Sequence, residues 1–380
     1  MKDTPRIIVS VTSDLVTDQR VNRNCLALRE QGFRVLLVGR ELPGSGPVGE
    51  RPYEVRRFRL PFRKGPLFYA SYNLALFFLL MRQKTDALFS NDLDTLTANY
   101  LASVIKRVPL VYDSHEYFTG VPEIQSRPLV RKVWQTIEKL IFPKLKTIIT
   151  VNDSIAALYS KEYGKELTVL RNIPSKPNLL PLTVSIEEER ARLNLPSGKK
   201  IVILQGSGIN IDRGSEEAVQ SMKHLENTVL LIIGGGDVMP VLKQTVADLH
   251  LENKVIFRNR MPYLSMMEHT RVCDLGLTLD KDTNINYRFS LPNKVFDYIH
   301  AGIPVLASHL PEVEKIIKGY EIGDFIENHR PETIADTIRK ILHDEGRVAQ
   351  WKKNLQIASQ ELNWENESKK FPDIIHELRH

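Results

Sequence analysis

Short apolar runs alternate with helical patterns along almost the whole chain, and this alternation constrains the fold more than any other feature. Near-continuous apolar strands separated by helices are typical of a parallel sheet that is covered on both faces. The sequence therefore predicts an α/β protein built from two Rossmann-like domains. The predicted strands are residues 6–11, 33–38, 87–90, 110–112 and 147–151 in the first half, and 200–205, 229–233, 255–257, 275–279 and 304–307 in the second.

The two halves are separated by a proline-rich stretch, residues 172–198, in which the apolar pattern is broken. We place a hinge there, with domains at 1–173 and 174–363. Residues 364–380 form a predicted final helix that is free to pack back on the first domain. Ligands of such sheets bind beyond the carboxyl ends of the strands, so we expect the two sheets to face a central cleft.

The 380 residues are 42% hydrophobic, which is enough for two packed cores. Cys25 and Cys273 are too few and too far apart for a disulfide framework or a metal site, so we expect two buried, reduced thiols. The N-terminal sequence does not resemble a secretory signal. The apolar run at 67–81 is shorter than the roughly 20 residues that span a bilayer, and it predicts a buried or interfacial helix. These observations favour a cytoplasmic protein.

The net charge of +6 favours anionic partners. Residues 51–64 carry six Arg or Lys and one Glu, and residues 128–146 form a basic amphipathic segment around Trp134. No nucleic-acid-binding motif accompanies them, so an anionic membrane surface or an acidic substrate ranks above nucleic acid. An ordinary solvated face for 51–64, and a domain helix with its apolar side in the core for 128–146, remain alternatives.

Two loops that follow strands in the first half carry candidate residues. Residues 13–20 include Asp14 and Arg20 but lack G-x-G-x-x-G, which disfavours NAD binding. This loop either binds phosphate at a helix start, or Asp18 caps the helix and Arg20 is solvated. The second loop contains the segment YDSHE, in which three of four successive residues are titratable: Asp113, His115 and Glu116. His115 can donate to a phosphate or a sugar hydroxyl while a carboxylate fixes its tautomer.

Two further loops lie in the second half. The segment QGSGINIDRG contains Gly206, Ser207 and Arg213, and a second glycine turn contains Gly235 and Gly236. Glycines allow close approach of an anion, although no Walker motif is present. In the segment SLPNKVFDY, Ser290 or Asn293 is expected to cap a helix, with Lys294 and Asp297 one turn apart on it. This pattern suits a diphosphate and ribose hydroxyls, and the alternative is a surface ion pair.

The run SLPNKVFDYIHAGIPV resembles the signature of family-4 retaining glycosyltransferases of the GT-B fold, in which an E-x7-E motif precedes G-x-P-V. The resemblance extends over most of the chain, through YDSHE, TVNDSIA, LRNIP, QGSGINIDRG and IIGGGD. It implies a nucleoside-diphosphate sugar as donor, with UDP or GDP as the nucleotide, no cofactor, and a glycan or lipid-linked acceptor. The variant L-P-N-K is similar to that of relatives thought to build cell-surface polysaccharides.

The resemblance also implies roles for individual residues. Arg213 falls on the phosphate-binding Lys of the family, His115 on the His that contacts the donor, and Asp297 on the second acidic residue, a ribose-hydroxyl acceptor. Two positions depart from the pattern, because Phe289 replaces the first Glu and Ser207 falls near a common Arg. Lys294 is expected to replace that lost cation. Asp14, Arg20, Asp113 and Glu116 are expected to line the cleft on the acceptor side.

The expected reaction is sugar transfer with retention, by front-face attack and without an essential metal, with closure of the hinge excluding water. The segment Asp92-Leu93-Asp94 matches the D-x-D of metal-dependent enzymes, but helix capping or a cleft-lining role fits its surroundings better. A nucleotide-sugar 2-epimerase and a non-catalytic sugar-nucleotide-binding protein are the alternative functions. The expected location is the cytoplasm, at the inner face of the membrane if the acceptor is lipid-linked.

Overall fold

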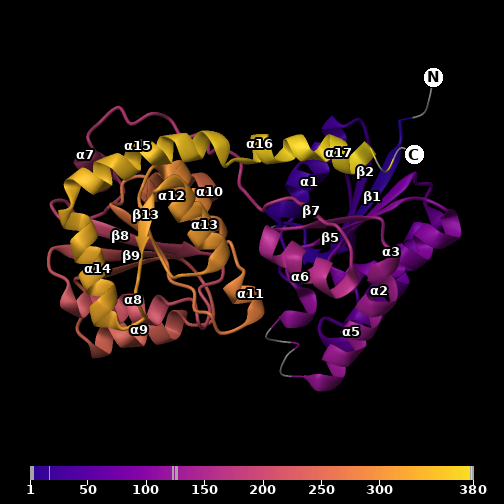
Figure 1. The fold of residues 1–380 in the computed structure, drawn as a ribbon, viewed down its shortest axis with the longest axis horizontal. Helices are drawn as coiled ribbons and strands as arrows, with labels where there is room; N and C mark the ends of the chain where they lie inside the picture. The colour runs from indigo at the N-terminus through magenta and orange to yellow at the C-terminus, as the bar shows by residue number, and fades with distance from the viewer. Residues whose placement is uncertain (1–3, 17, 122–123, 125–126, 377, 379–380) are drawn as a thin grey trace. The chain divides into compact units, whose positions relative to one another are not determined.

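The computed structural model describes residues 4–16, 18–121, 124, 127–376 and 378. The chain divides into two compact units (Figure 1). Unit 1 comprises residues 1–172 and 367–380, and unit 2 comprises residues 173–366. Each unit is an α/β structure around one parallel sheet, so the predicted fold class of two Rossmann-like domains is confirmed.

The sheet of unit 1 has the strand order β3-β2-β1-β4-β5-β6-β7, with every paired strand parallel. Its strands are β1 (Arg6–Asp14), β2 (Arg34–Arg40), β3 (Glu54–Phe58), β4 (Ala87–Asn91), β5 (Leu110–Ser114), β6 (Thr147–Thr150) and β7 (Thr168–Val169). Its helices are α1 (Gln19–Glu30), α2 (Gly65–Arg82), α3 (Leu93–Lys106), α5 (Pro128–Ile141), α6 (Asp153–Tyr163) and α17 (Phe371–His376).

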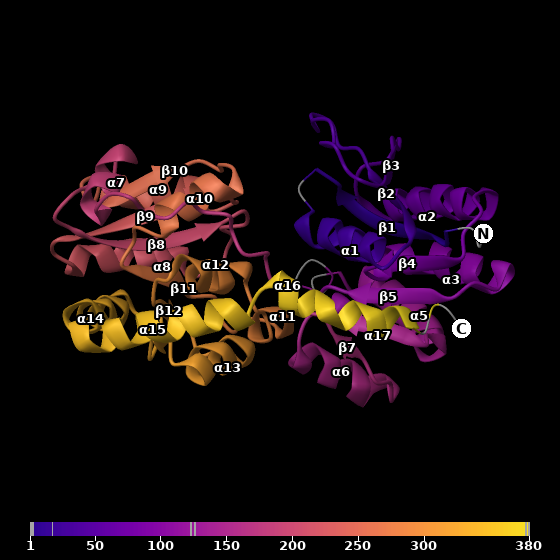
Figure 2. The ribbon, with the colours of Figure 1, turned by 90° about the horizontal axis from the view of Figure 1, so that it is seen from above.

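The helices of unit 1 cover both faces of its sheet. Helix α1 connects β1 to β2, whereas α2, α3 and α5 connect strands that progress in the opposite direction across the sheet. Because parallel crossovers are right-handed, α1 lies on one face, and α2, α3 and α5 lie on the other. Figure 2 shows the same unit from above.

The sheet of unit 2 has the order β10-β9-β8-β11-β12-β13 and is also parallel. Its strands are β8 (Lys200–Gly206), β9 (Thr228–Gly234), β10 (Val255–Arg258), β11 (Leu275–Thr278), β12 (Val305–Ala307) and β13 (Gly323–Phe325). Its helices are α7 (Ile186–Arg192), α8 (Ser215–Ser221), α9 (Met239–Asp248), α10 (Tyr263–Thr270), α11 (Ile285–Arg288), α12 (Asn293–Ala301), α13 (Pro311–Tyr320), α14 (Pro331–His343), α15 (Glu345–Glu361) and α16 (Trp364–Glu367).

Alternate residues of β8 explain how unit 2 is layered. Ile201 and Ile203 pack in one core with residues of α12, α13 and α15, while Val202 and Leu204 pack in a second core with residues of α8, α9 and α14. Since successive side chains of a strand point to opposite faces, the sheet is buried on both sides. Both predicted thiols, Cys25 and Cys273, are buried and free.

Three features of the elements were not predicted. The predicted hinge segment contains α7, which begins with a capping box between Ser185 and Glu188. The final segment is helical from Trp364 to His376 as predicted, but it is irregular, because a 3-10 turn at Ser368–Lys370 joins α16 to α17, which has Pro372 in its first turn. The basic stretch 51–64 contains the edge strand β3, whose Arg57 lies 3.9 Å from Asp14. Residues 377, 379 and 380 of the predicted final helix lie outside the described residues.

Candidate functional site

The carboxyl ends of β1, β4 and β5 meet at one edge of the unit 1 sheet, and Asp113 is the centre of a network there. Arg20 donates to both oxygens of Asp113, from Nε at 3.1 Å and from Nη2 at 2.6 Å. Asn24 donates to the same carboxylate at 3.0 Å. Arg20 and Asp113 are both buried, so the expectation of a solvated Arg20 is wrong. Asp18, by contrast, caps α1 as the alternative predicted, accepting from the amide of Val21.

His115 lies between two carboxylates. Its Nδ1 is 3.0 Å from Asp92 and its Nε2 is 3.3 Å from Asp113. Burial lowers the pKa of His115, but the charges of Asp92 and Asp113 and the hydrogen bonds to them outweigh burial and raise the pKa to about 10. The ring is therefore an imidazolium at neutral pH. It supplies positive charge and hydrogen bonds, and it is not available as a general base.

The backbone of Asp92 is strained. Its φ of 58° and ψ of 165° lie in a region that is essentially restricted to glycine. Its amide donates to the carbonyl of Asp113, and its carboxylate accepts from the amide of His115. Asp92 occupies the N-cap position of α3 but makes no side-chain cap, so its carboxylate serves His115 instead. Asp94, the other acidic residue of the D-x-D segment, bonds to Thr12.

Two residues predicted on the acceptor side take no part in this network. Asp14 accepts from Ser45 and from the amide of Val16. Glu116 is exposed, and its backbone carbonyl accepts from the hydroxyl of Ser114. The network therefore brings together Arg20, Asp113 and His115, and it adds Asp92, to which the sequence assigned only a capping or lining role.

In unit 2, two glycine-containing loops interlock at the carboxyl ends of β8 and β9. The amide of Ile209 donates to the carbonyl of Gly235 at 2.9 Å. A Cβ on Gly236 would lie 2.1 Å from the carbonyl oxygen of Ile209, so only glycine fits there. Around Gly206, in contrast, no atom lies closer than 3.9 Å to where a Cβ would be. The loop is thus fixed on one side and has room beside Gly206.

Arg213 and Lys294 meet at one buried carboxylate, Asp280. Arg213 Nη1 lies 2.9 Å from one oxygen of Asp280, and Lys294 Nζ lies 3.8 Å from the other. The Arg213 guanidinium also stacks over the ring of Tyr287 at 4.3 Å, and its Nε has no hydrogen-bond partner among the described residues. Two cations therefore share one negative charge.

The ionisation of Lys294 depends on this neighbourhood. Burial lowers the pKa of Lys294 below its ordinary value, and the charge of Arg213 acts in the same direction, while Asp280 opposes both. Lys294 belongs to the first turn of α12 and retains 13% of its side-chain exposure. An anion that bound here would favour the charged form, so the arrangement can bind a phosphate group.

Asp297 lies one turn further along α12 and is held from two sides. Tyr263 donates to one carboxylate oxygen at 2.9 Å, and Gln205 donates to the other at 3.1 Å. Gln205 is itself held by Thr270, at 2.7 Å. Lys294 and Asp297 are not an isolated surface ion pair, because Asp297 is buried and each of the two contacts different residues.

Other residues of the predicted motif are placed differently. Neither Ser290 nor Asn293 caps α12, because Pro292 occupies the N-cap position, and Ser290 instead donates to the carbonyl of Tyr287. Asn293 is exposed, and Phe289 follows the end of α11. Ser207 contributes its carbonyl, which accepts from Arg260.

Sequence reasoning missed Asp280, Arg260 and Tyr263. Arg260 is an exposed cation whose Nε lies 3.0 Å from the position of a Cβ on Gly235. Asp280 comes directly after the predicted strand 275–279, so its place at a strand end was the signal that could have identified it. Tyr263 begins α10 and gave no such signal.

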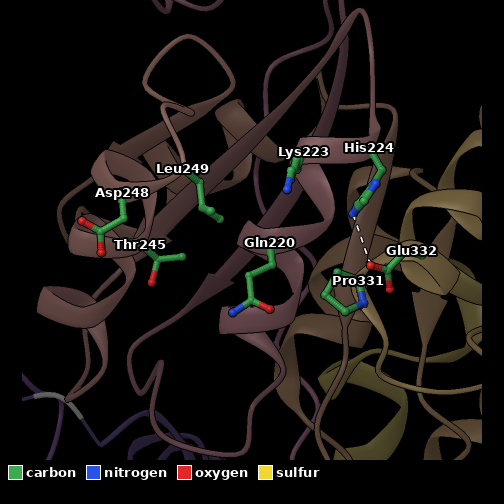
Figure 3. Close-up of a pocket in the computed structure, with 8 residues that line it drawn as sticks. All are labelled: Gln220, Lys223, His224, Thr245, Asp248, Leu249, Pro331 and Glu332. Carbon is green, nitrogen blue, oxygen red and sulfur yellow. Dashed lines mark ion pairs between the residues drawn. The ribbon is translucent and has the colours of Figure 1, made fainter.

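A hollow elsewhere in unit 2 does not belong to this site. It contains an ion pair of 3.5 Å between His224 and Glu332 (Figure 3). Its residues at the ends of α8 and α9 precede β9 and β10, which places them at the amino edge of the sheet. The residues lining the hollow are Gln220, Lys223, His224, Thr245, Asp248, Leu249, Pro331 and Glu332.

Both units match families of sugar-transferring enzymes. Residues 19–173 match the family described as Glycosyltransferase Family 4, and residues 185–357 match the family described as Glycosyl transferases group 1. Sucrose-phosphate synthase from Thermosynechococcus elongatus has a similar structure, with a TM-score of 0.81, 17% identity and 99% of both chains covered. Anabaena HepE, solved with UDP-glucose, gives a TM-score of 0.76 at 16% identity, covering 98% of this chain and 100% of that one.

The fold and these matches define the chain as a glycosyltransferase of the GT-B fold. Within that class, its N-terminal unit matches Glycosyltransferase Family 4 over residues 19–173. A chitobiosyldiphosphodolichol beta-mannosyltransferase of Candida albicans is 23% identical over 230 residues, which are 57% of this chain and 49% of that relative. The aligned region thus spans about half the length of this relative.

Proposed function

We propose that this protein transfers a sugar with retention from a UDP- or GDP-linked donor to a glycan or lipid-linked acceptor. The observation that carries the proposal is the convergence of Arg213 and Lys294 on Asp280. Lys294 also lies one helical turn from Asp297 on α12. This arrangement leaves positive charge available for a diphosphate and places a carboxylate where ribose hydroxyls can donate to it.

The donor would bind along the carboxyl edge of the unit 2 sheet. Its diphosphate would be held by Arg213, Lys294 and the amides around Gly206 and Gly235, and its ribose by Asp297. When the bond between the anomeric carbon and the phosphate oxygen breaks, negative charge accumulates on the departing nucleoside diphosphate. Fixed cations stabilise that charge without reorganising, and this stabilisation is commonly the largest contribution to such catalysis.

The acceptor hydroxyl would attack the anomeric carbon from the face that the diphosphate leaves, which retains the configuration. The hydroxyl proton would leave with the departing phosphate, so no carboxylate nucleophile is required. His115 would act as a fixed imidazolium that supplies positive charge, since its raised pKa keeps it protonated and both ring nitrogens already face carboxylates. Because Arg213 and Lys294 supply the positive charge, we propose that transfer proceeds without a metal.

The L-P-N-K variant motif supports a role in cell-surface polysaccharide synthesis at the inner face of the cytoplasmic membrane. The printed name of the Candida albicans relative, which refers to a diphosphodolichol, supports a lipid-linked acceptor. The UDP-glucose complex of HepE supports a nucleotide-sugar donor. Within the described residues, no helix combines the length and the apolar character that crossing a bilayer requires.

The donor can be identified by thermal unfolding with UDP-, GDP-, ADP- and dTDP-sugars. A ligand that binds only the native state raises the melting temperature, so the preferred donor should give the largest rise. Transfer of its sugar to a membrane or glycan extract, in the presence of a chelator, then tests the reaction. Consumption of the donor without an acceptor would instead indicate an epimerase, and binding without any transfer would indicate a non-catalytic binding protein.

A further inference from the structure

The exposed apolar side chains of unit 1 are concentrated on three helices. Helices α2, α3 and α5, with the loop before α2, carry every large apolar side chain that is exposed among the described residues of this unit. Scattered apolar residues on a surface are ordinary, but a concentrated set marks an interaction surface. The set is Phe62, Leu67, Leu74, Phe78, Leu101, Val104, Ile105, Leu129, Val133 and Leu140.

These helices form one continuous layer. Helix α2 packs along α3, and α3 packs against α5. The rings of Tyr69 on α2 and Trp134 on α5 meet edge to face at 5.1 Å. Figures 1 and 2 both show α2 and α3 side by side. We call the outer surface of this layer the helical face.

The exposed residues are not part of the core of unit 1. On α5 the buried positions are Trp134, Glu138 and Ile141, while Leu129, Val133 and Leu140 are 81%, 57% and 60% exposed. Their spacing of four and seven residues places these three on one stripe of the helix. The three buried residues are enough to pack α5 against the core of unit 1. The three exposed apolar residues are therefore available to contact a partner.

The charge around this stripe has a single sign. Residues 127–146 contain six Lys or Arg and one acidic residue, Glu138, which is buried and bonded to Tyr163. Helices α2 and α3 add Arg82 and Lys106, and their one acidic residue, Asp94, is buried. Residues 127–146 therefore supply a net charge of +5, against +6 for the whole chain.

Basic side chains also line a hollow on α5 beside the apolar stripe. Arg131, Lys132 and Lys139 lie along it, with Pro128, Gln135 and Thr136. A lipid bilayer with anionic headgroups matches this combination, because phosphates can occupy the basic hollow while the apolar side chains reach the acyl boundary. A protein partner would have to cover an apolar stripe that is bordered by uncompensated positive charge.

We propose that the helical face docks on the surface of an anionic lipid bilayer. Docking is peripheral, with Leu129, Val133 and Leu140 inserted at the interface and Lys132 and Lys139 at the headgroups. The inference goes beyond the proposed function, because vesicle binding can occur whether or not the protein transfers sugar. Only the link to a lipid-linked acceptor rests on the proposed function.

The test is co-sedimentation of the full chain with vesicles. The protein should bind vesicles of phosphatidylcholine mixed with phosphatidylglycerol, should not bind phosphatidylcholine alone, and should dissociate in high salt. The double substitution Val133→Glu and Leu140→Glu should weaken binding by about tenfold or more. The matched control is Val241→Glu and Ile357→Glu in unit 2, at residues that are 55% and 58% exposed, and it should bind as the wild type does.

A second pair of variants tests the charge. Lys132→Gln with Lys139→Gln should weaken binding by about 30-fold at low salt, while Lys352→Gln with Lys353→Gln on α15 should not. Equal binding to neutral and anionic vesicles, or full binding by Val133→Glu with Leu140→Glu, would overturn the proposal. The proposal would also be overturned if the wild type were a dimer that did not bind vesicles and the substitutions Val133→Glu with Leu140→Glu made it a monomer. The helical face would then be an interface between two copies of the chain.

Failure of the docking surface and failure of the proposed function give different results. The helical-face variants should keep the melting-temperature rise given by the preferred donor. Arg213→Ala should lose that rise and still bind anionic vesicles.

Discussion

The two strand-end sites of this protein use charge in opposite ways. In unit 1, the cations Arg20 and His115 face the carboxylates Asp113 and Asp92, so the network is balanced without a ligand. In unit 2, Arg213 and Lys294 share Asp280 alone. A balanced buried network fixes geometry, whereas an unbalanced one attracts an anion. Substitutions in unit 1 should therefore change stability and protonation, and those in unit 2 should change donor binding.

The largest effect is expected for Asp113→Ala. Removing this carboxylate leaves Arg20 buried without its partner, which should reduce the free energy of unfolding by about 3–5 kcal/mol. Denaturant unfolding would measure it. Glu41→Ala, which breaks the exposed ion pair with Arg59, is the control and should unfold like the wild type. An Asp113→Ala protein as stable as the wild type would show that the unit 1 network does not fix structure.

A smaller effect, on the reaction with the donor and not on stability, is expected for Arg213→Ala. Loss of the cation should lower kcat/KM by about 100-fold, because the departing diphosphate loses a fixed positive group. Arg288→Ala is a matched control in the same unit, since Arg288 forms an exposed pair with Asp282 at 2.8 Å. Steady-state kinetics with the preferred donor would measure both. If Arg213→Ala and Arg288→Ala lowered kcat/KM equally, the comparison between the two sites would be wrong.

The smallest effect is a change in pH dependence for Asp92→Asn. The charge of Asp92 is the main factor that raises the pKa of His115, so the variant should lower that pKa from about 10. In the wild type, the stabilisation from His115 is fully present below pH 6.5 and is lost as the pH rises through about 10. NMR titration of the His115 ring would measure the pKa. An unchanged value would mean that Asp113 alone holds the proton.

The fold was predictable because its signal is local and repeated. All ten predicted strands are present, since each contains an apolar run, although only Val255 is buried in the edge strand β10. The strands that were missed lack this signal. In β3, Arg56 and Arg57 interrupt the pattern at a sheet edge, and β7 and β13, two and three residues long, have no buried residue.

The sites were predictable only in part, because contacts between loops depend on strand order. Arg213 and Lys294 stood out through their motifs, but Asp280, which joins them, belongs to no motif. Asp92 was visible only as half of a D-x-D segment, and its contact with His115 arises because β4 and β5 are neighbours in the sheet. Pairing of distant strands cannot be read from spacing along one chain.

The positive-φ backbone at Asp92 sets two contributions to stability against each other at a single position. Glycine would relieve backbone strain of about 1–3 kcal/mol, and this relief by itself would favour Asp92→Gly. That replacement would also release the imidazole of His115 from its anionic neighbour. Because the charge of Asp92 does most to raise the pKa of His115, this release loses stabilisation, and a variant library ranked by melting temperature would show which of the two contributions is larger.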